Sequence, residues 1–279
     1  MITLFTIPKA FSGHSGVIQR NAIRSWTRLP GCEVILFGEE VGLREAAAEL
    51  GVRHVPAIQR NDHGTPMVSD AFEQIRRLAS TPLVAYVNTD IIFDDSLLVA
   101  VHAMQASSQP AWLLVGQRHD LDITQSMDFS DGWPERLRSD VARRGVLHGK
   151  AGIDYFVFAR EFPLKLPDFA VGRPGWDSWL IYMARARGLP LVDGSACVLA
   201  VHQNHPPAYR PFGTEARANA SAAGGYYRMG TLRDADWRLV WGKDGQPALR
   251  PSYLGRLLFM PPARMLLAAK RYAQAGYGH

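Results

Sequence analysis

The sequence has little cysteine, no long apolar run and no charge excess over most of its length. Its 279 residues include two cysteines, Cys32 and Cys197, which are far apart and outside any CxxC pair, so neither a disulfide framework nor a structural zinc site is expected. No apolar stretch approaches the roughly 20 residues of a membrane-spanning helix. The N-terminal residues lack a cationic region and a small-residue cleavage site, which predicts a strand and not a secretory signal. These absences favour a reducing, cytoplasmic setting.

The excess positive charge is confined to the C-terminal residues. Of the 31 Lys and Arg residues, five lie in 245–279, which contains none of the 26 Asp and Glu residues, so 26 basic and 26 acidic residues remain in 1–244. A nucleic-acid-binding protein would carry a basic face across its fold, so nucleic acid is not an expected partner. We expect a neutral catalytic body, residues 1–244, followed by a basic extension, residues 245–279.

Short apolar segments alternate with helical patterns along the chain. Strands are predicted at 2–7, 33–37, 52–55, 83–87, 112–116, 155–159, 189–192 and 197–201, and helices at 16–29, 41–50, 66–79, 94–104, 134–143 and 176–187. This alternation predicts an α/β fold with a mostly parallel sheet covered on both faces. Ligands bind such sheets at the carboxyl ends of the strands, so chemistry is expected after Ile7, Phe37 and Val87.

Two stretches interrupt the alternation. Residues 118–149 are polar, with few apolar repeats, and predict a long excursion that contains one short helix. Residues 206–230 are rich in Gly, Ala and Pro and predict a mobile loop or lid. The sequence contains no internal repeat.

The strongest local motif is Asn88-Thr89-Asp90, directly after an apolar strand. If the strand geometry persists, side chains 88 and 90 point to the same side. Oxygen ligands at a strand end can hold a hard divalent cation, which in turn holds a diphosphate. In the alternative interpretation, Asp90 caps a turn and Asp94 caps the following helix.

Together with its surroundings, this motif resembles the GT-A class of nucleotide-sugar glycosyltransferases, in particular a group of bacterial and plant GT-A-like proteins. The resemblance covers about residues 1–205, and it is carried by the segments TIPKAF, GVIQRNAIRSW, ILFG, GTPMVSDAF, YVNTDII, RPGWDSWLIY and HQNH. The class carries an Asp-any-Asp element at the end of a central strand, and Asn88 replaces the first Asp here, which gives a neutral oxygen in place of a charge.

The resemblance implies a GT-A-like fold with a nucleotide-binding half, residues 1–117, and an acceptor-binding half, residues 118–244. It implies Mn²⁺ or Mg²⁺ as the cofactor, a nucleoside diphosphate sugar as the donor, and a carbohydrate or lipid-linked acceptor. The implied activity is transfer of a hexosyl-type sugar in bacterial surface polysaccharide or glycolipid synthesis, with inverting or retaining stereochemistry left open.

The implied donor site lies at the ends of the first strands. The turn after the first strand would contact the nucleoside, the first helix would face the same pocket, and the helix entered through Thr65 offers free N–H groups to an anion. The expected donor residues are Thr6, Ile7, Pro8, Arg20, Asn21, Gly38, Thr65, Asp70, Asn88, Thr89 and Asp90. The alternatives are a solvated helix charge at Arg20, an ordinary polar turn at Gly38 and a helix cap at Thr65.

A second group of residues suggests the acceptor side. Trp176 and Trp179 flank Asp177 after a Pro-Gly turn, and aromatic rings pack well on the C–H faces of sugars. By the resemblance, Asp177 takes the place of the base of an inverting enzyme, and Asp154 is its rival, which could instead bind the donor or acceptor sugar. Alternatively, Asp177 is a helix N-terminal acid favoured by the macrodipole.

The last strand is followed by the sequence His-Gln-Asn-His. Many GT-A enzymes recruit a late histidine to the metal, so His202 or His205 would join Asp90 in binding it. The alternative is that both histidines are surface or hydrogen-bonding residues. The resemblance does not distinguish His202 from His205.

The basic extension mixes apolar blocks with single cations. Residues 250–272 are expected to attach the protein to an anionic membrane surface near a lipid-linked acceptor. The alternative is a C-terminal helix that packs on the body with its basic face in water.

Two other functions compete with glycosyl transfer. A nucleotidyltransferase that builds the sugar nucleotide would carry a Gly-rich basic phosphate loop after the first strand, which TIPKAFSGHSG does not provide. A non-catalytic carbohydrate- or nucleotide-binding module would need the two tryptophans but would leave Asp90, Asp177 and His202 without a task.

Overall fold

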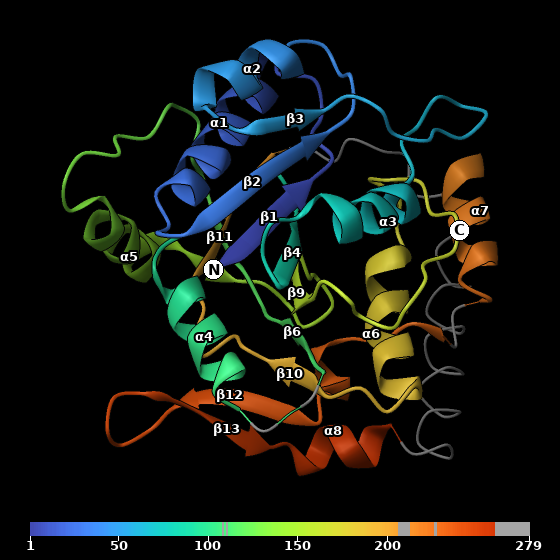
Figure 1. Cartoon of the computed structure of the whole chain (residues 1–279). Coiled ribbons are helices and arrows are strands. Elements are labelled where there is room, and N and C mark those ends of the chain that lie inside the picture. Colours follow the sequence, from blue (N-terminus) through green and yellow to red (C-terminus); the bar gives the residue numbers. More distant parts are fainter. Residues whose placement is uncertain (108, 110, 206–212, 226–227, 260–279) are drawn as a thin grey trace.

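The described strands form a large sheet and a small one (Figure 1). The computed structural model describes residues 1–107, 109, 111–205, 213–225 and 228–259. In spatial order the large sheet contains β13 (Pro247–Pro251), β12 (Trp237–Trp241), β10 (Leu191–Asp193), β6 (Leu113–Val115), β9 (Tyr155–Ala159), β4 (Leu83–Val87), β1 (Ile2–Thr6), β2 (Cys32–Phe37) and β3 (Arg53–Val55). Only β9 and β13 run antiparallel to their described neighbours, so the predicted mostly parallel α/β sheet is confirmed.

Helices cover both faces of this sheet, as predicted. Side chains alternate along β1, so Leu4 joins one buried cluster and Phe5 joins the other. The first cluster is closed by α1 (Gly13–Thr27), α2 (Leu43–Leu50) and α4 (Ser96–Gln105). The second is closed by α3 (Val68–Leu78) and α6 (Trp176–Ala186), and Figure 1 shows α4 and α6 on opposite sides of the strands.

The small sheet has the order β5 (Ile91–Phe93), β11 (Ala200–Gln203), β7 (His119–Leu121) and β8 (Val146–Leu147). Helix α5 (Trp133–Arg144) packs on it through a separate apolar cluster. Its register sets His202 opposite Ile91 on one side and Asp120 on the other. The sequence predicted only β11, because the other strands are two or three residues long and β7 is polar.

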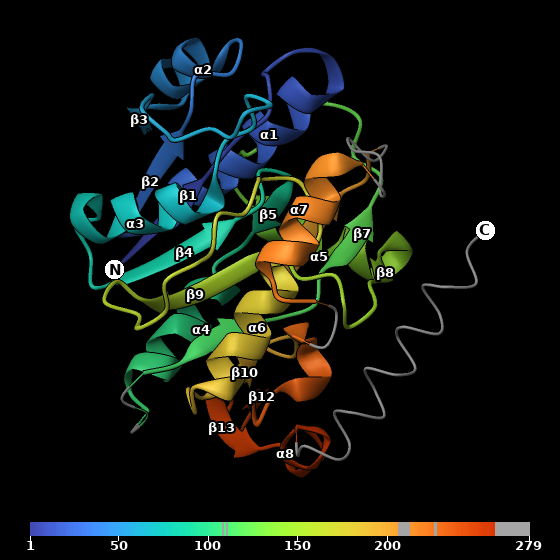
Figure 2. The ribbon, with the colours of Figure 1, turned by 90° about the vertical axis from the view of Figure 1, so that its right-hand side faces the viewer.

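The prediction of a mobile loop or lid over 206–230 is wrong for its central part. Residues Thr214–Ala222 form α7, which lies on the same side as α6 (Figure 2). The buried side chain of Asn219 accepts from the Ala170 N–H at 2.9 Å and donates to the Ala170 carbonyl at 3.1 Å. Residues 206–212 and 226–227 lie outside the described residues.

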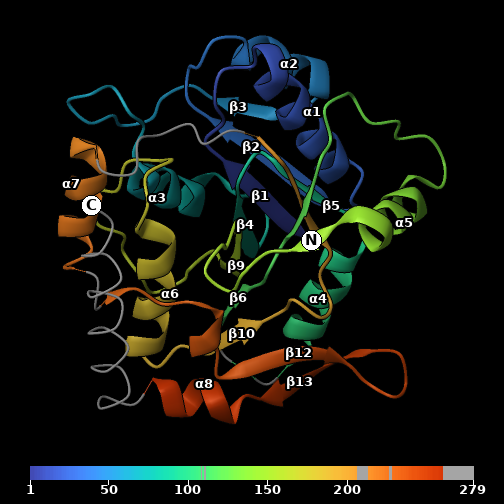
Figure 3. The ribbon, with the colours of Figure 1, turned by 180° about the vertical axis from the view of Figure 1, so that it is seen from behind.

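The expected boundaries do not coincide with separate structural units. Strand β9, from the expected acceptor half, is inserted between β4 and β6 of the expected nucleotide half. The position 244/245 falls within the β12–β13 hairpin, which lies at the end of the sheet opposite β3 (Figures 1 and 3).

The chain beyond β13 continues on the body through α8 (Tyr253–Leu258). The guanidinium of Arg256 lies 4.9 Å from the Trp237 ring centroid, and Arg185 lies 4.7 Å from that of Phe259. Residues up to 259 therefore belong to the body, and the rest of the expected extension, 260–279, lies outside the described residues. Among the helices described, none combines the length and the apolar character that crossing a membrane requires.

Candidate active site

A cavity of about 620 Å³ opens where the central strands end. Its wall contains residues that follow β1 and β4, residues that precede the antiparallel β9, and the loop that enters α6. All of these segments reach the same edge of the sheet, which is where parallel α/β sheets bind ligands. The sequence-based expectation of chemistry at this edge thus coincides with a real cavity.

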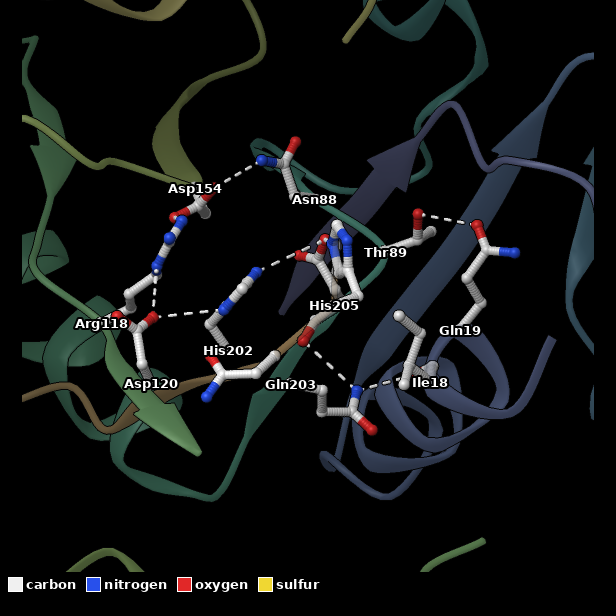
Figure 4. A network of polar contacts seen from close by, with 12 residues as sticks. Ile18, Gln19, Asn88, Thr89, Arg118, Asp120, Asp154, His202, Gln203 and His205 are labelled. Carbon is white, nitrogen blue, oxygen red and sulfur yellow. Dashed lines mark hydrogen bonds and ion pairs between the residues drawn. The ribbon is translucent and has the colours of Figure 1, made fainter. Parts of the chain in front are cut away.

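Asp90, His202 and His205 form a cluster on this wall, and Figure 4 shows the two imidazole rings close to each other. The Asp90 Oδ2 atom lies 2.9 Å from His205 Nε2 and 3.8 Å from His202 Nε2. One ligand atom from each of the three residues lies within 4.8 Å of the others. Asp90 Oδ1 is buried and has no hydrogen-bond partner among the residues described. An unsatisfied carboxylate oxygen beside two imidazoles fits a divalent cation that accepts mixed oxygen and nitrogen ligands.

The charges around this cluster favour the forms that bind metal. Burial acts to raise the pKa of Asp90, but the hydrogen bond from His205 and nearby positive charge, including that of Lys9, outweigh it and lower the pKa below the usual value. Burial lowers the pKa of His202 in spite of the nearby Asp90 charge. An ionised carboxylate and a neutral imidazole are the protonation states required of metal ligands.

Buried amides fix the loop that carries Asp90. Gln203 donates to the Asp90 carbonyl from its main-chain nitrogen at 3.1 Å and from Nε2 at 3.2 Å, and Nε2 also donates to the Ile18 carbonyl at 2.8 Å. Thr89 Oγ1 donates to Gln19 Oε1 at 3.0 Å. The first helix, α1, therefore anchors the strand exit that presents the carboxylate.

A chain of charged side chains lies behind His202 (Figure 4). Its Nδ1 atom lies 3.2 Å from Asp120 Oδ1, while Nε2, on the other side of the ring, lies 3.8 Å from Asp90 Oδ2. Arg118 donates from Nε to the same Asp120 oxygen at 2.9 Å and from its terminal nitrogen to Asp154. Asp154, directly before β9, lines the cavity together with Arg118.

Asp177 lies on the wall of the cavity in the first turn of α6. Burial raises its pKa to about 6, the backbone N–H of Ser178 opposes the shift, and the Asp154 charge adds to it. A carboxyl group with a pKa near neutral pH is suited to accept a proton. The adjacent Trp176 also lines the cavity, and its ring centroid lies 4.9 Å from that of Tyr86.

Many of the residues expected at the site line this one cavity. They are Ile7, Pro8, Thr65, Asn88, Thr89, Asp90, Asp154, Trp176, Asp177, His202 and His205. Asn88 and Asp90 do not share a partner, however, because Asn88 contacts Asp154 and Asp90 contacts the histidines.

Other expected donor residues lie elsewhere. Thr6 is fully buried within β1 and Gly38 is absent from the cavity wall. Arg20 pairs with Glu49 at 2.8 Å on the surface of α1. Asp70 accepts from the Gln59 N–H at 2.8 Å and lines a different cavity, of about 210 Å³.

Two further expected residues are buried in the interior. Asn21 is fully buried and donates to Gln203 Oε1 at 3.0 Å, so it supports the Asp90 loop from behind. Trp179 is only 5% exposed and packs edge-on against Phe169 with ring centroids 5.6 Å apart. Neither side chain is presented to the cavity.

The cavity also contains charged residues that sequence reasoning missed: Lys9, Glu40, Arg118 and Arg173. Glu40 follows β2, so the strand-end rule, which pointed to Gly38, was off by two residues. Arg118 follows β6, lines the cavity and pairs there with Asp120 and Asp154. No local pattern signals that role.

The solved structures described next are distantly similar to this chain. No family model and no curated protein matches the sequence. Among solved structures, glucosyl-3-phosphoglycerate synthase from Mycobacterium tuberculosis with Mg²⁺ and uridine diphosphate is similar at 16% identity and a TM-score of 0.48, over 81% of this chain and 80% of that one. Another structure of that synthase is similar at 15% identity and a TM-score of 0.48, over 92% of each chain. A mycobacterial protein is similar at 15% identity and a TM-score of 0.49, over 90% of this chain and 83% of that one.

We predict that Asn21 and Arg20 differ sharply in their effect on stability. Asn21→Ala leaves the buried Gln203 amide and the Met127 N–H without their partner, which should cost about 1–3 kcal/mol. Arg20→Ala removes a partly exposed ion pair and should cost less than about 1 kcal/mol. Urea unfolding of the two variants measures both values. Equal losses would contradict the buried role assigned to Asn21.

Proposed function

We propose that this protein transfers a sugar from a nucleoside diphosphate sugar to a hydroxyl group of a carbohydrate or lipid-linked acceptor. The observation that carries the proposal is that the Asp90, His202 and His205 cluster opens into the same cavity as Asp177. A candidate cation site and an acid with a pKa of about 6 then face the same cavity. Perturbed acids and ligand clusters that converge on a cavity are typical of enzymes.

Each part of the cavity wall has a task in this reaction. Asp90, His202 and His205 would hold Mn²⁺ or Mg²⁺, which, when bound, neutralises the charge that develops on the leaving diphosphate. The positively charged side chain of Lys9 belongs to a residue that lines the same cavity. Ile7 and Pro8, after β1, line the region assigned to the nucleoside.

In this proposal Asp177 and Trp176 serve the acceptor. Asp177 accepts the proton of the attacking hydroxyl if the enzyme inverts configuration, and Trp176 lines the cavity where a sugar would bind. A retaining enzyme needs no base there, and Asp177 would then lack this role. We assign the transfer to hexosyl-type sugars in surface polysaccharide or glycolipid synthesis.

The two competing functions find less support in the site. A binding module would use the tryptophan pair, but Trp179 is buried against Phe169 and only Trp176 reaches the cavity. A nucleotidyltransferase would need a glycine-rich phosphate loop after β1, and this turn contains Pro8 and Lys9 instead.

We also propose peripheral attachment to an anionic membrane through the C-terminal region. Three apolar side chains of α8, Tyr253, Leu254 and Leu257, are 75%, 58% and 60% exposed. Arg250 and Arg256 are close to them in sequence, and an exposed apolar face with cations is typical of peripheral membrane binding. Residues 260–272 of the expected segment lie outside the described residues.

The first prediction concerns donor and metal binding. Uridine, guanosine or thymidine diphosphate should raise the melting temperature by mass action, and Mn²⁺ should increase this shift. Asp90→Ala should abolish the manganese-dependent part because it removes the carboxylate of the cluster. Asp95→Ala, at an exposed acid paired with Arg138, is the matched control. A thermal-shift panel in which none of these diphosphates has an effect would count against the proposed function.

The second prediction concerns the base. Asp177→Asn should lower transfer by roughly 10²-fold or more while donor affinity stays unchanged, on the scale of general-base catalysis. In the wild type, kcat/KM should fall as the pH drops through about 6, because protonation removes the base. Product chromatography over a pH series measures both effects. Normal transfer by this variant, with Asp131→Asn as the control, would place the base elsewhere.

The third prediction concerns the membrane. Leu254→Ser combined with Leu257→Ser should lower co-sedimentation with phosphatidylglycerol vesicles, because it removes apolar area from the exposed face of α8. Val41→Ser, at a 76% exposed position far along the chain, is the control. Truncation at 244 is unsuitable because it would remove β13 from the sheet. Equal sedimentation of all three proteins would exclude a contribution from α8.

A further inference from the structure

The side chain of Asn88 is turned toward Asp154 and away from the metal cluster (Figure 4). Its Nδ2 atom donates to Asp154 Oδ1 at 2.6 Å, and its main-chain nitrogen donates to the Asp154 carbonyl at 2.9 Å. The antiparallel register of β4 and β9 pairs Val87 with Tyr155, so 88 and 154 are the next facing positions. The large sheet therefore imposes this pair, whatever side chains occupy it.

The Asp154 carboxylate is fixed from two sides. Asn88 holds Oδ1, and the guanidinium of Arg118 holds Oδ2. The same guanidinium also pairs with Asp120, which faces His202. The positive charge of Arg118 is thus already shared between two carboxylates, those of Asp120 and Asp154.

A carboxylate at position 88 would be unfavourable for this reason. It would face Asp154 as a like charge across the ladder, in place of the amide that now donates to it. The Asn88 amide is also committed to Asp154 and is turned away from His202 and His205, which form the candidate cation cluster with Asp90 (Figure 4).

We propose that Asn88 is a positioning residue that holds Asp154 in place, and that the divalent cation is bound without it, by Asp90, His202 and His205. The contact with Asp154 then explains why Asn replaces the first Asp of the Asp-any-Asp pattern. Asn88 is not a weakened metal ligand. The second half of this proposal rests on the proposed function, whereas the first half depends only on the fold.

The test is a double-mutant cycle with the full-length chain: wild type, Asn88→Asp, Asp154→Asn and the exchanged pair that carries both changes. Asn88→Asp should lower the melting temperature by at least about 2 °C. The same change made in the Asp154→Asn variant should lower the melting temperature less, because the new carboxylate then faces an amide that can donate a hydrogen bond to it. Mn²⁺ titration calorimetry should show that Asn88→Asp binds the ion no more tightly than the wild type.

Two results would overturn the proposal. One is Mn²⁺ affinity at least tenfold higher in Asn88→Asp, which would make position 88 a ligand. The other is an equal loss of melting temperature in both backgrounds, which would remove the coupling to Asp154. If the wild type binds no Mn²⁺, the proposed metal site fails, while the melting temperatures still decide the role of Asn88. Asn88→Ala, which adds no charge, is the reference variant. Its melting temperature should fall less than that of Asn88→Asp.

Discussion

A partly buried carboxylate at the end of a central strand constrains most of what surrounds it. Asp90 is 14% exposed, and a charge removed from water is costly unless partners compensate it. The compensation comes from His202 and His205, which the chain reaches more than 100 residues later. The small sheet brings the two segments together. Strand β11 pairs with β5, which begins directly after Asp90, and this pairing places His202 beside the carboxylate.

The large sheet and its helices could be predicted because they follow local patterns. The apolar run 83–87 and the helical spacing of 66–79 each occur within one segment of chain. The same reasoning identified Asp90, which follows β4 at the edge where strand ends meet. His202 lies within β11, and its place at the metal was expected from the resemblance to GT-A enzymes. Asp177 was expected at the site from the same resemblance, whereas the Pro-Gly turn before it indicates only that a helix starts there.

The rest could not be predicted because it depends on contacts between distant segments. Asn21 occupies an inward position on α1, and only its contact with Gln203, 182 residues away, shows that it is structural. Only two residues separate Trp176 and Trp179, yet Trp176 lines the cavity and Trp179 packs against Phe169 in the core. Arg118 lies in a polar stretch without any motif, and its two ion pairs become visible only when β6, β7 and β9 are assembled.

The choice of amides around the candidate cation site has a physical reason. Gln19, Asn21 and Gln203 hold the loops near Asp90 through hydrogen bonds, and none of them adds a charge there. A charged side chain in these positions would compete with the histidines for the Asp90 carboxylate or repel a bound cation. Neutral groups whose hydrogen bonds are satisfied can rigidify a site without this effect. Arg118 and Asp120 lie one contact further away, on the far side of His202, and leave the Asp90 carboxylate available.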